Sequence, residues 1–202
     1  RVLCFMMTIL YEVGQNLYVN VTNKCPCACT FCIRNNGDGA HGSDSLWLDR
    51  EPSYEEIISA FEQHDLSKYN EIVFCGYGEP LERVDIVVKV CKYLREVSNC
   101  KIRINTNGLA NLIHKRDVVP ELKGCFDTIS VSLNAGCEES YLKVTRPKFK
   151  EGSYHAMLEF ANECKKVAPN VIFSVVDVIS KEEIALSQSV ADSLNIPLRV
   201  RK

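Results

Sequence analysis

Three cysteines near the amino end of the chain have the spacing of ligands for an iron-sulfur cluster. Cys25, Cys29 and Cys32 form a C-x3-C-x2-C pattern, with Cys27 as a fourth thiol among them. Three thiolates at this spacing can each bind one iron of a cubane cluster, which leaves the fourth iron open to a cofactor or substrate. The segment therefore predicts a metal centre with a free coordination position.

A zinc site is the main alternative for these cysteines. Tetrahedral structural zinc usually needs two separated Cys or His pairs, and no second pair with matching spacing follows in the sequence. The four histidines are scattered along the chain without paired-ligand spacing. Zinc is thus the weaker interpretation at this point.

Six segments alternate between apolar and polar residues in the manner of β-strands, and helical patterns separate them. Such regular alternation favours parallel strands with helices packed outside the sheet. Ser53 with Glu56, and Ser180 with Glu183, have the spacing of capping boxes that begin helices. The predicted strands are residues 17–22, 71–75, 101–107, 128–134, 171–178 and 198–201.

The predicted strands have one apolar and one polar face, as where Ile102 and Ile104 alternate with Arg103 and Asn105. Parallel strands buried on both faces would be almost wholly apolar. We therefore expect an α/β fold, a partial (β/α)6 TIM-like barrel of parallel strands with outer helices and a polar, ligand-binding lumen. An open doubly wound sheet, or edge strands with one face in water, are the alternatives. The cysteines follow the first strand, at the end where (β/α) proteins keep their chemistry.

The composition is that of a globular protein, with 46% hydrophobic and 25% charged residues among 202. We expect a single domain over residues 1–202, with 1–15 as an N-terminal extension and the apolar run 2–10 as core. A net charge of -2 offers no basic patch for nucleic acid, and no apolar run is long enough to span a membrane. Eleven cysteines without a signal peptide favour a cytoplasmic, metal-binding protein over a disulfide-bonded one.

The cysteine motif resembles the signature of the radical S-adenosylmethionine (SAM) superfamily, C-x3-C-x-φ-C with φ aromatic, where Phe31 supplies the aromatic residue. The resemblance implies a 4Fe-4S cluster on Cys25, Cys29 and Cys32, SAM chelated by the open iron, and Phe31 near the adenine. It also implies that Cys27 is not a ligand, because C-x-C spacing fits the family poorly. The implied enzyme cleaves SAM reductively to a 5'-deoxyadenosyl radical that abstracts hydrogen from an unknown substrate.

Further SAM contacts are implied near the ends of the strands. The sequence C-G-Y-G-E-P at 75–80 resembles the family's G-G-E-P turn, which places three of its residues against the methionine ammonium; an ordinary β-to-α turn is the alternative. Small polar residues that end the third and fourth strands suit a ribose, although Asn107 before Gly108 can equally serve a left-handed turn. After the fifth strand, the family often has a glycine pattern that supports the adenine. This sequence lacks those glycines, so the resemblance implies only a hydrophobic contact there. The implied contacts are Gly78, Glu79, Pro80, Asn105, Asn107, Ser132, Asn134, Val178 and Ile179.

Across almost the whole chain, the sequence is most similar to stand-alone radical SAM proteins associated with TatD-family hydrolases. N-V-T-N-K-C at 20–25, F-C-G-Y-G-E-P at 74–80 and N-T-N-G at 105–108 carry this likeness. It implies an electron donor such as flavodoxin or ferredoxin and suggests a TatD-family hydrolase as a partner. A small-molecule enzyme, an activating enzyme for a protein partner and a non-catalytic zinc or Cys-rich binding module all remain open. The long loop 34–51 either covers the site and contributes to partner recognition or is a plain surface excursion.

Overall fold

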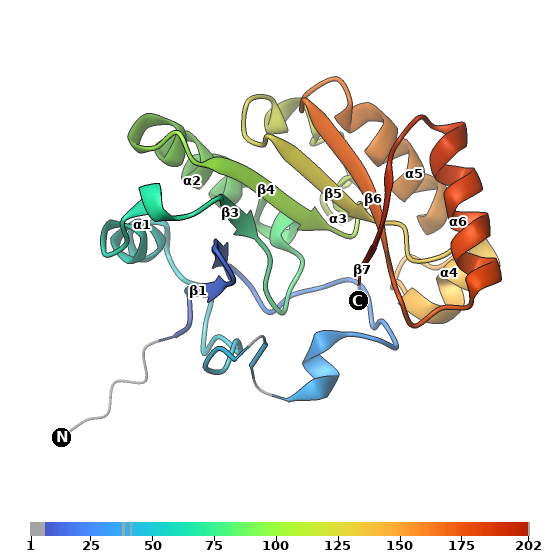
Figure 1. The fold of residues 1–202 in the computed structure, drawn as a ribbon, viewed down its shortest axis with the longest axis horizontal. Coiled ribbons are helices and arrows are strands. Elements are labelled where there is room, and N and C mark those ends of the chain that lie inside the picture. The colour runs from blue at the N-terminus through green and yellow to red at the C-terminus, as the bar shows by residue number, and fades with distance from the viewer. Residues whose placement is uncertain (1–6, 38, 41, 202) are drawn as a thin grey trace.

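Seven strands form one curved sheet in the computed structural model, which describes residues 7–37, 39–40 and 42–201. The strands lie side by side in chain order, and each neighbouring pair from β2 to β7 is parallel. Figure 1 shows them crossing the middle of the molecule. The strands are β1 Leu10–Val13, β2 Asn16–Val19, β3 Glu71–Phe74, β4 Lys101–Thr106, β5 Thr128–Ser132, β6 Asn170–Val176 and β7 Leu198–Arg201.

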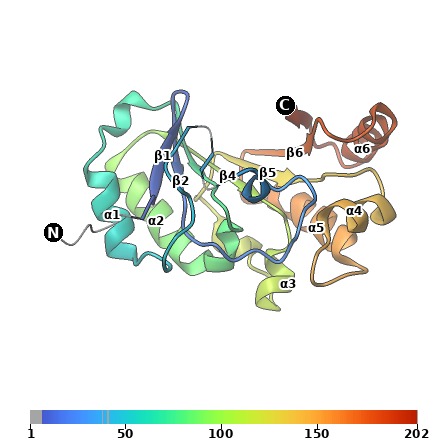
Figure 2. The same ribbon diagram turned by 90° about the horizontal axis from the view of Figure 1, so that it is seen from below.

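Helices connect the parallel strands and cover one face of the sheet, as Figures 1 and 2 show. A doubly wound sheet reverses its strand order near the middle, whereas this order runs without reversal from β1 to β7. The α/β class and the partial barrel with outer helices are thus confirmed. The helices are α1 Tyr54–Glu62, α2 Val84–Val97, α3 Ala110–His114, α4 Glu138–Thr145, α5 Ser153–Cys164 and α6 Lys181–Ser193, with short 3-10 turns at Ile33–Asn36, Leu66–Lys68, Pro80–Arg83 and Val119–Leu122.

The prediction of six strands missed β1, which joins the sheet as an antiparallel edge strand. Tyr11 pairs with Tyr18, and a two-residue turn begins at Gly14 with φ at 58°. A left-handed residue at that position suits the tight turns of hairpins. Residues 10–13 are therefore part of the sheet and not an extension, and most of the predicted apolar run 2–10 lies outside the described residues.

Several strands end earlier than predicted because their last side chains bind elsewhere. β2 ends at Val19, and beyond it the Asn20 amide donates to the Leu46 carbonyl at 2.8 Å. The Thr22 hydroxyl donates to Glu51 at 2.9 Å. β6 ends at Val176, before the predicted limit at 178. The residues after the strands thus form loops that fold over the carboxyl edge of the sheet.

The two faces of the sheet differ as the alternation predicted. Ile102 and Ile104 are buried in one hydrophobic core with residues of α2 and α5. Full burial of such a side chain stabilises the fold by about 1.5–3 kcal/mol. Arg103 and Ser130, which alternate with apolar residues of β4 and β5, are 8% and 5% exposed. The opposite face is therefore polar but largely shielded from water.

Of the two predicted capping boxes, one forms completely and the other only in part. Ser53 and Glu56 form a complete capping box at α1. Ser180 accepts from the Glu183 amide and caps α6, but no return bond from the Glu183 side chain completes a box. Glu183 instead accepts from the Gly136 amide at 3.1 Å, and so joins α6 to the loop after β5. None of the helices in the described part of the chain has the length and apolarity needed to span a lipid bilayer.

Candidate functional site

The cysteine segment lies at the carboxyl edge of the sheet and is fixed to the end of α4. The Ala28 amide donates to the Thr145 carbonyl at 3.0 Å, and the Thr30 amide donates to the Val144 carbonyl at 2.9 Å. Cys27 forms an isolated antiparallel bridge with Pro147. These main-chain contacts hold the segment in place independently of any metal. Figure 1 shows this segment, in blue, passing along the lower side of the molecule toward α4.

The four thiols of the segment differ in environment. Cys27 is 6% exposed, whereas Cys25, Cys29 and Cys32 are only partly buried. Hydrogen bonds with the sulfurs of Cys25 and Cys29, together with burial, raise the pKa of the Cys27 thiol. The same hydrogen bonds lower the pKa of Cys25 and of Cys29. Hydrogen bonding among the sulfurs therefore makes Cys25 and Cys29 easier to deprotonate and Cys27 harder.

The sulfurs do not surround a single point. Within the described residues, no three His, Cys, Asp or Glu side chains converge as ligands of one metal ion. In a cubane each thiolate binds a different iron, so its cysteines need not share one coordination sphere. Soft thiolate donors also suit iron-sulfur chemistry. The donor set fits the predicted cluster.

Arg34 brings a positive charge to this segment. Its Nε donates to the Cys32 sulfur at 3.4 Å, and its charge also interacts with Cys25 and Cys29. The interaction with Cys32 raises the pKa of Arg34 against the opposing effect of burial. Sequence reasoning missed Arg34, although its position two residues after the last predicted ligand was a usable signal. The guanidinium offsets negative charge that accumulates on the thiolates.

The glycine turn after β3 packs directly against the residues that lead into the cysteine segment. A Cβ on Gly76 would collide with Asn20 Oδ1, and one on Gly78 would collide with the Thr22 carbonyl. Only glycine permits such close approach of two backbones. The Glu79 amide then donates to the Lys24 carbonyl at 2.8 Å. The predicted SAM turn and the predicted cluster segment are therefore neighbours.

Glu79 connects this turn to the end of β4. Its Oε1 accepts from the Thr106 hydroxyl at 2.7 Å and from the Leu81 amide at 3.1 Å, and its Oε2 accepts from the Asn107 amide at 2.7 Å. Burial raises the pKa of Glu79 to about 7. Three of roughly four acceptor positions of this carboxylate are thus occupied by the protein. Among the described residues, no donor occupies the remaining acceptor position on Oε2.

The two asparagines near the end of β4 have different surroundings. Asn107 Nδ2 lies 4.0 Å from the Cys25 sulfur and 3.9 Å from the Cys27 sulfur. Its Oδ1 accepts from the Leu109 amide at 2.9 Å, so the turn interpretation also holds. Asn105 accepts from Arg103 Nη1 at 2.7 Å on the polar face of the sheet. Asn107 is therefore next to the cysteines, while Asn105 belongs to a separate network.

Asn134 is the clearest unsatisfied group near the end of β5. It is 5% exposed, adopts φ of 63°, and its Oδ1 has no hydrogen-bond partner. Buried acceptors are nearly always paired, so this oxygen is suited to a ligand donor such as a ribose hydroxyl. Ser132 lies in β5 opposite Ser174 of β6.

The remaining implied SAM contacts are less well placed. Phe31 is partly exposed next to the cysteines. Ile179 packs against the main core, but Val178 is 66% exposed in the turn after β6. An adenine contact by Val178 would need the ligand itself to cover that side chain. Of the two candidates after β6, Ile179 thus has the better-packed position.

The long loop after the cysteines returns to the site. Trp47 lies 5.9 Å from the Arg34 guanidinium and packs edge-on against Tyr77, with ring centres 5.0 Å apart. The Tyr77 hydroxyl donates to the Gly37 carbonyl at 2.7 Å. Asn23 exchanges two hydrogen bonds with the main chain of Leu48. The loop therefore packs over the cysteine segment and the glycine turn, while its predicted role in partner recognition stays a prediction.

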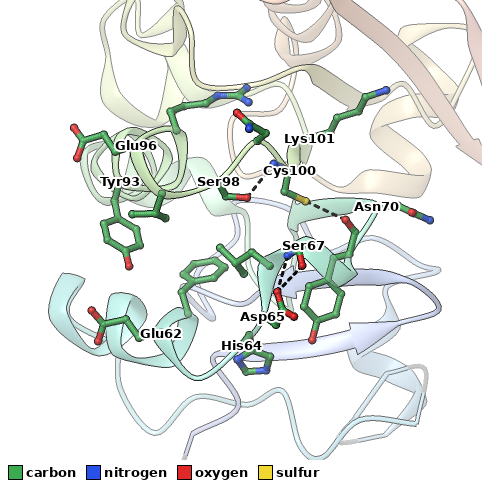
Figure 3. A pocket seen from close by; sticks show the side chains of 16 residues that line it. Glu62, His64, Asp65, Ser67, Asn70, Tyr93, Glu96, Ser98, Cys100 and Lys101 are labelled. Atoms are coloured by element: carbon green, nitrogen blue, oxygen red, sulfur yellow. Dashed lines mark hydrogen bonds between the residues drawn. The ribbon is translucent and has the colours of Figure 1, made fainter.

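A cleft of about 1090 Å³ lies at the other end of the sheet. Figure 3 shows its walls, which come from the ends of α1 and α2 and from the loop between α1 and β3. Cys100 and Lys101 line it where β4 begins. Catalytic groups of (β/α) barrels cluster at the carboxyl ends of strands, so this cleft is not the candidate site.

Comparison with known proteins agrees with this geometry. Residues 19–185 match the model of the Radical SAM superfamily. A GTP 3',8-cyclase of Rhodococcus opacus is 28% identical over 67% of the chain, and a probable dual-specificity RNA methyltransferase RlmN of Fervidobacterium nodosum is 30% identical over 72%. The chain spans only 36% and 40% of the length of these two relatives.

Solved structures share the fold. A radical SAM methyltransferase from Sphaerobacter thermophilus has a TM-score of 0.60 at 17% identity, with 95% of this chain and 68% of that chain covered. Streptococcus suis SuiB, solved with bound S-adenosylmethionine, has a TM-score of 0.61 at 17% identity, with 91% and 37% covered. At these identities, the likeness supports the partial barrel alone.

Proposed function

The chain belongs to the radical SAM superfamily, and from that premise we propose that Cys25, Cys29 and Cys32 bind a 4Fe-4S cluster in an enzyme that uses SAM. When bound, the cluster and SAM supply the electron and the 5'-deoxyadenosyl radical that abstracts hydrogen from the substrate. The residues of the chain hold both groups, position them and limit the access of water.

One observation carries the proposal: three motifs far apart in the sequence meet at one edge of the sheet. The cysteine segment follows β2, the glycine turn follows β3 and Asn107 follows β4. Glu79 accepts from the backbone amide of Asn107, and the side-chain amide of Asn107 lies 4.0 Å from the Cys25 sulfur. A structural zinc site would not need this glycine turn beside it, whereas a cofactor bound by both motifs does.

We assign the SAM contacts by the same proximity. Gly78 and Pro80 shape the turn beside the cysteines, and its backbone carbonyls suit the methionine ammonium with help from the free position on Glu79. The unpaired Asn134 oxygen suits a ribose hydroxyl, which can donate to it, and the Ser132 hydroxyl can donate to the carboxylate. Phe31 and Ile179 offer apolar surface for the adenine. Each assignment rests on placement and donor chemistry.

The partners are also proposals. Superfamily members need an electron donor, for which flavodoxin or ferredoxin is suitable. The motif at 20–25 supports the TatD-associated subgroup and hence a TatD-family hydrolase as partner. In the structure, Asn20, Thr22 and Asn23 of this motif bind the segment 46–51, so the motif determines how the long loop is folded. Copurification of the hydrolase with the wild-type chain, but not with a Trp47→Ala variant, would support a role of that loop.

Anaerobic reconstitution tests the central proposal. The protein is incubated with iron and sulfide, freed of excess reagents, and assayed for bound iron and sulfide. Dithionite and SAM are then added, and 5'-deoxyadenosine is measured by chromatography. We expect about four irons for each chain and formation of 5'-deoxyadenosine. A protein that binds zinc tightly but neither retains iron nor forms 5'-deoxyadenosine would instead be the Cys-rich binding module.

A pair of cysteine variants provides the matched comparison. Cys29→Ala removes a proposed ligand, so it should abolish both cluster retention and SAM cleavage. Cys137→Ala removes an exposed thiol at the start of α4, outside the cysteine segment, and should change neither. Equal loss in the two variants would point to non-specific iron binding by thiols.

A further inference from the structure

β7 places two arginines on the polar face of the sheet. Arg199 pairs with Ser174 of β6, which pairs in turn with Ser132 of β5. Side chains two residues apart on a strand share a face, so Arg201 lies on the same side as Arg199. The last strand therefore adds positive charge to the face that also carries proposed SAM contacts.

The charge of Arg201 is not balanced by the protein. Its Nε is buried and has no hydrogen-bond partner among the described residues. Burial lowers the pKa of Arg201, and the charges of Arg199 and Arg103 lower it further. The main opposing influences come from Cys75 and Tyr18. Burial keeps the pKa of Cys75 above its usual value, so this thiol is neutral at pH 7.

Arg103 shows how a guanidinium on this face is normally satisfied. Its Nε donates to Glu71 at 3.0 Å and its Nη1 donates to Asn105 at 2.7 Å. Arg103 is thus neutralised by the chain itself. Among the described residues, no carboxylate pairs with Arg201, which is only partly exposed, and withdrawing a charge from water without a partner is unfavourable. Since arginine stays protonated in proteins, this guanidinium is suited to an anion from outside the described residues.

The position of Arg201 indicates which anion is expected. Its charge interacts with Cys75, which follows β3 immediately before the glycine turn, and with Arg103 of β4. The side chain thus extends from the edge strand across the polar face, toward the strands that carry the cluster segment and SAM turn. A guanidinium fork matches the paired oxygens of a carboxylate or phosphate.

We propose that Arg201, with Arg199 at the rim, binds the anionic group of the substrate, a carboxylate or a phosphate, on the polar face of the barrel. The binding of an anion does not depend on the proposed function. Only the identification of that anion as a group of the substrate rests on it. The anion completes the charge balance of the face and orients the substrate beside the SAM site. Arg201 and Arg199 are then specificity-determining residues.

Anion binding can be measured without the cluster. Isothermal titration of the apo protein with inorganic phosphate, and separately with succinate, distinguishes the two chemistries. Wild-type protein should bind at least one of them, and Arg201→Gln should weaken that binding about tenfold or more, as expected for loss of a charge-assisted contact. Arg116→Gln is the matched control, because Arg116 is a surface arginine paired with Glu121. Equal affinity in wild type and Arg201→Gln, or no binding of either anion by wild type, overturns the proposal.

The free energy of unfolding gives a second readout, because an arginine paired within the protein and an arginine that awaits an anion respond differently to substitution. Without added anion, Arg201→Met should be at least as stable as wild type in chemical unfolding, because it removes an uncompensated charge. The anion should then raise the stability of wild type but not of the variant. Marked destabilisation by Arg201→Met in the absence of anion would show that the protein itself pairs the charge, and would overturn the proposal.

Competition with SAM separates the two sites. In cluster-loaded protein, saturating SAM should leave the anion bound, whereas displacement would mean that Arg201 holds the SAM carboxylate and no substrate group. If the protein fails to assemble a cluster, the apo titration still decides the anion site. Failure of the proposed function is thus distinguishable from failure of this inference.

Discussion

Arg34 Nε donates to the sulfur of Cys32 at 3.4 Å, while the same guanidinium lies 5.9 Å from the centre of the Trp47 ring. The arginine therefore links a proposed cluster ligand to the loop that covers it. Its other nitrogens reach the carbonyls of Asn23 and Cys27 at 3.4 Å. The positive charge is thus held at the cysteine segment by contacts on several sides.

This arrangement predicts an effect on the reduction potential. A nearby cation stabilises the reduced, more negative cluster, so Arg34→Gln should shift the midpoint potential to more negative values by on the order of 50 mV. A redox titration of reconstituted protein, followed by electron paramagnetic resonance, measures the shift. Arg34→Lys keeps the positive charge, so its midpoint potential should lie close to that of the wild type. An unchanged potential in Arg34→Gln with full iron content would mean that the arginine serves the loop alone.

Asn134 yields a prediction for SAM binding. Asn134→Gly removes the unpaired amide oxygen but tolerates the left-handed φ of 63° without strain. We expect the Kd for SAM, measured by equilibrium dialysis on cluster-loaded protein, to rise about tenfold, as for one lost hydrogen bond.

Asn195→Gly is a matched control, because Asn195 also has positive φ, at 52°, and follows α6. Its Kd should equal that of wild type. If Asn134→Gly binds SAM with the Kd of the wild type, Asn134 does not contact SAM.

What the sequence revealed about the site depends on how local each feature is. The cysteine spacing and the glycine turn could be identified because each lies within a few consecutive residues. The Arg34, Trp47 and Tyr77 cluster could not, because it forms only when the long loop folds back onto the turn. Glu79 was named from the glycine turn, but its hydrogen bonds were not predicted, because its carboxylate binds groups more than 25 residues away.

The fold was predictable to a similar extent. Alternating apolar and polar residues identified six parallel strands, because a half-buried strand leaves a clear period-2 pattern. β1 was missed although β2, β3 and β7 are equally short, because its neighbouring Leu10 and Tyr11 break the alternation of apolar and polar residues. The Ser53 capping box was recognised from local sequence, whereas the Glu183 side chain binds distant Gly136 for tertiary reasons.

The assignment of Cys27 as a non-ligand predicts opposite results for neighbouring cysteines. Cys27→Ala should retain full iron content after reconstitution and lose only about 1 kcal/mol of stability, from a small cavity. Cys25→Ala should fail to retain the cluster. Iron and sulfide analysis of both variants checks this, and loss of iron from Cys27→Ala with retention in Cys25→Ala would reverse the ligand assignment.

Glu79 predicts how stability depends on pH in the cluster-free protein. The unfolded carboxyl loses its proton near pH 4.5, whereas the folded one keeps it to about pH 7. Between these values the folded state binds more protons, so the free energy of unfolding falls as pH rises, by roughly 3 kcal/mol at most. Glu79→Gln cannot ionise and should lack this part of the decline.

Urea unfolding at a series of pH values from about 5 to 8 measures both proteins. The glutamine loses one acceptor oxygen and places a donor near the Asn107 amide, so the variant should be less stable at every pH. That offset is independent of pH and so does not affect the slope of either curve. The difference in the free energy of unfolding between wild type and Glu79→Gln should therefore narrow as pH rises toward 8. Parallel curves would show that the hydrogen bonds from Thr106, Leu81 and Asn107 keep Glu79 ionised despite its burial.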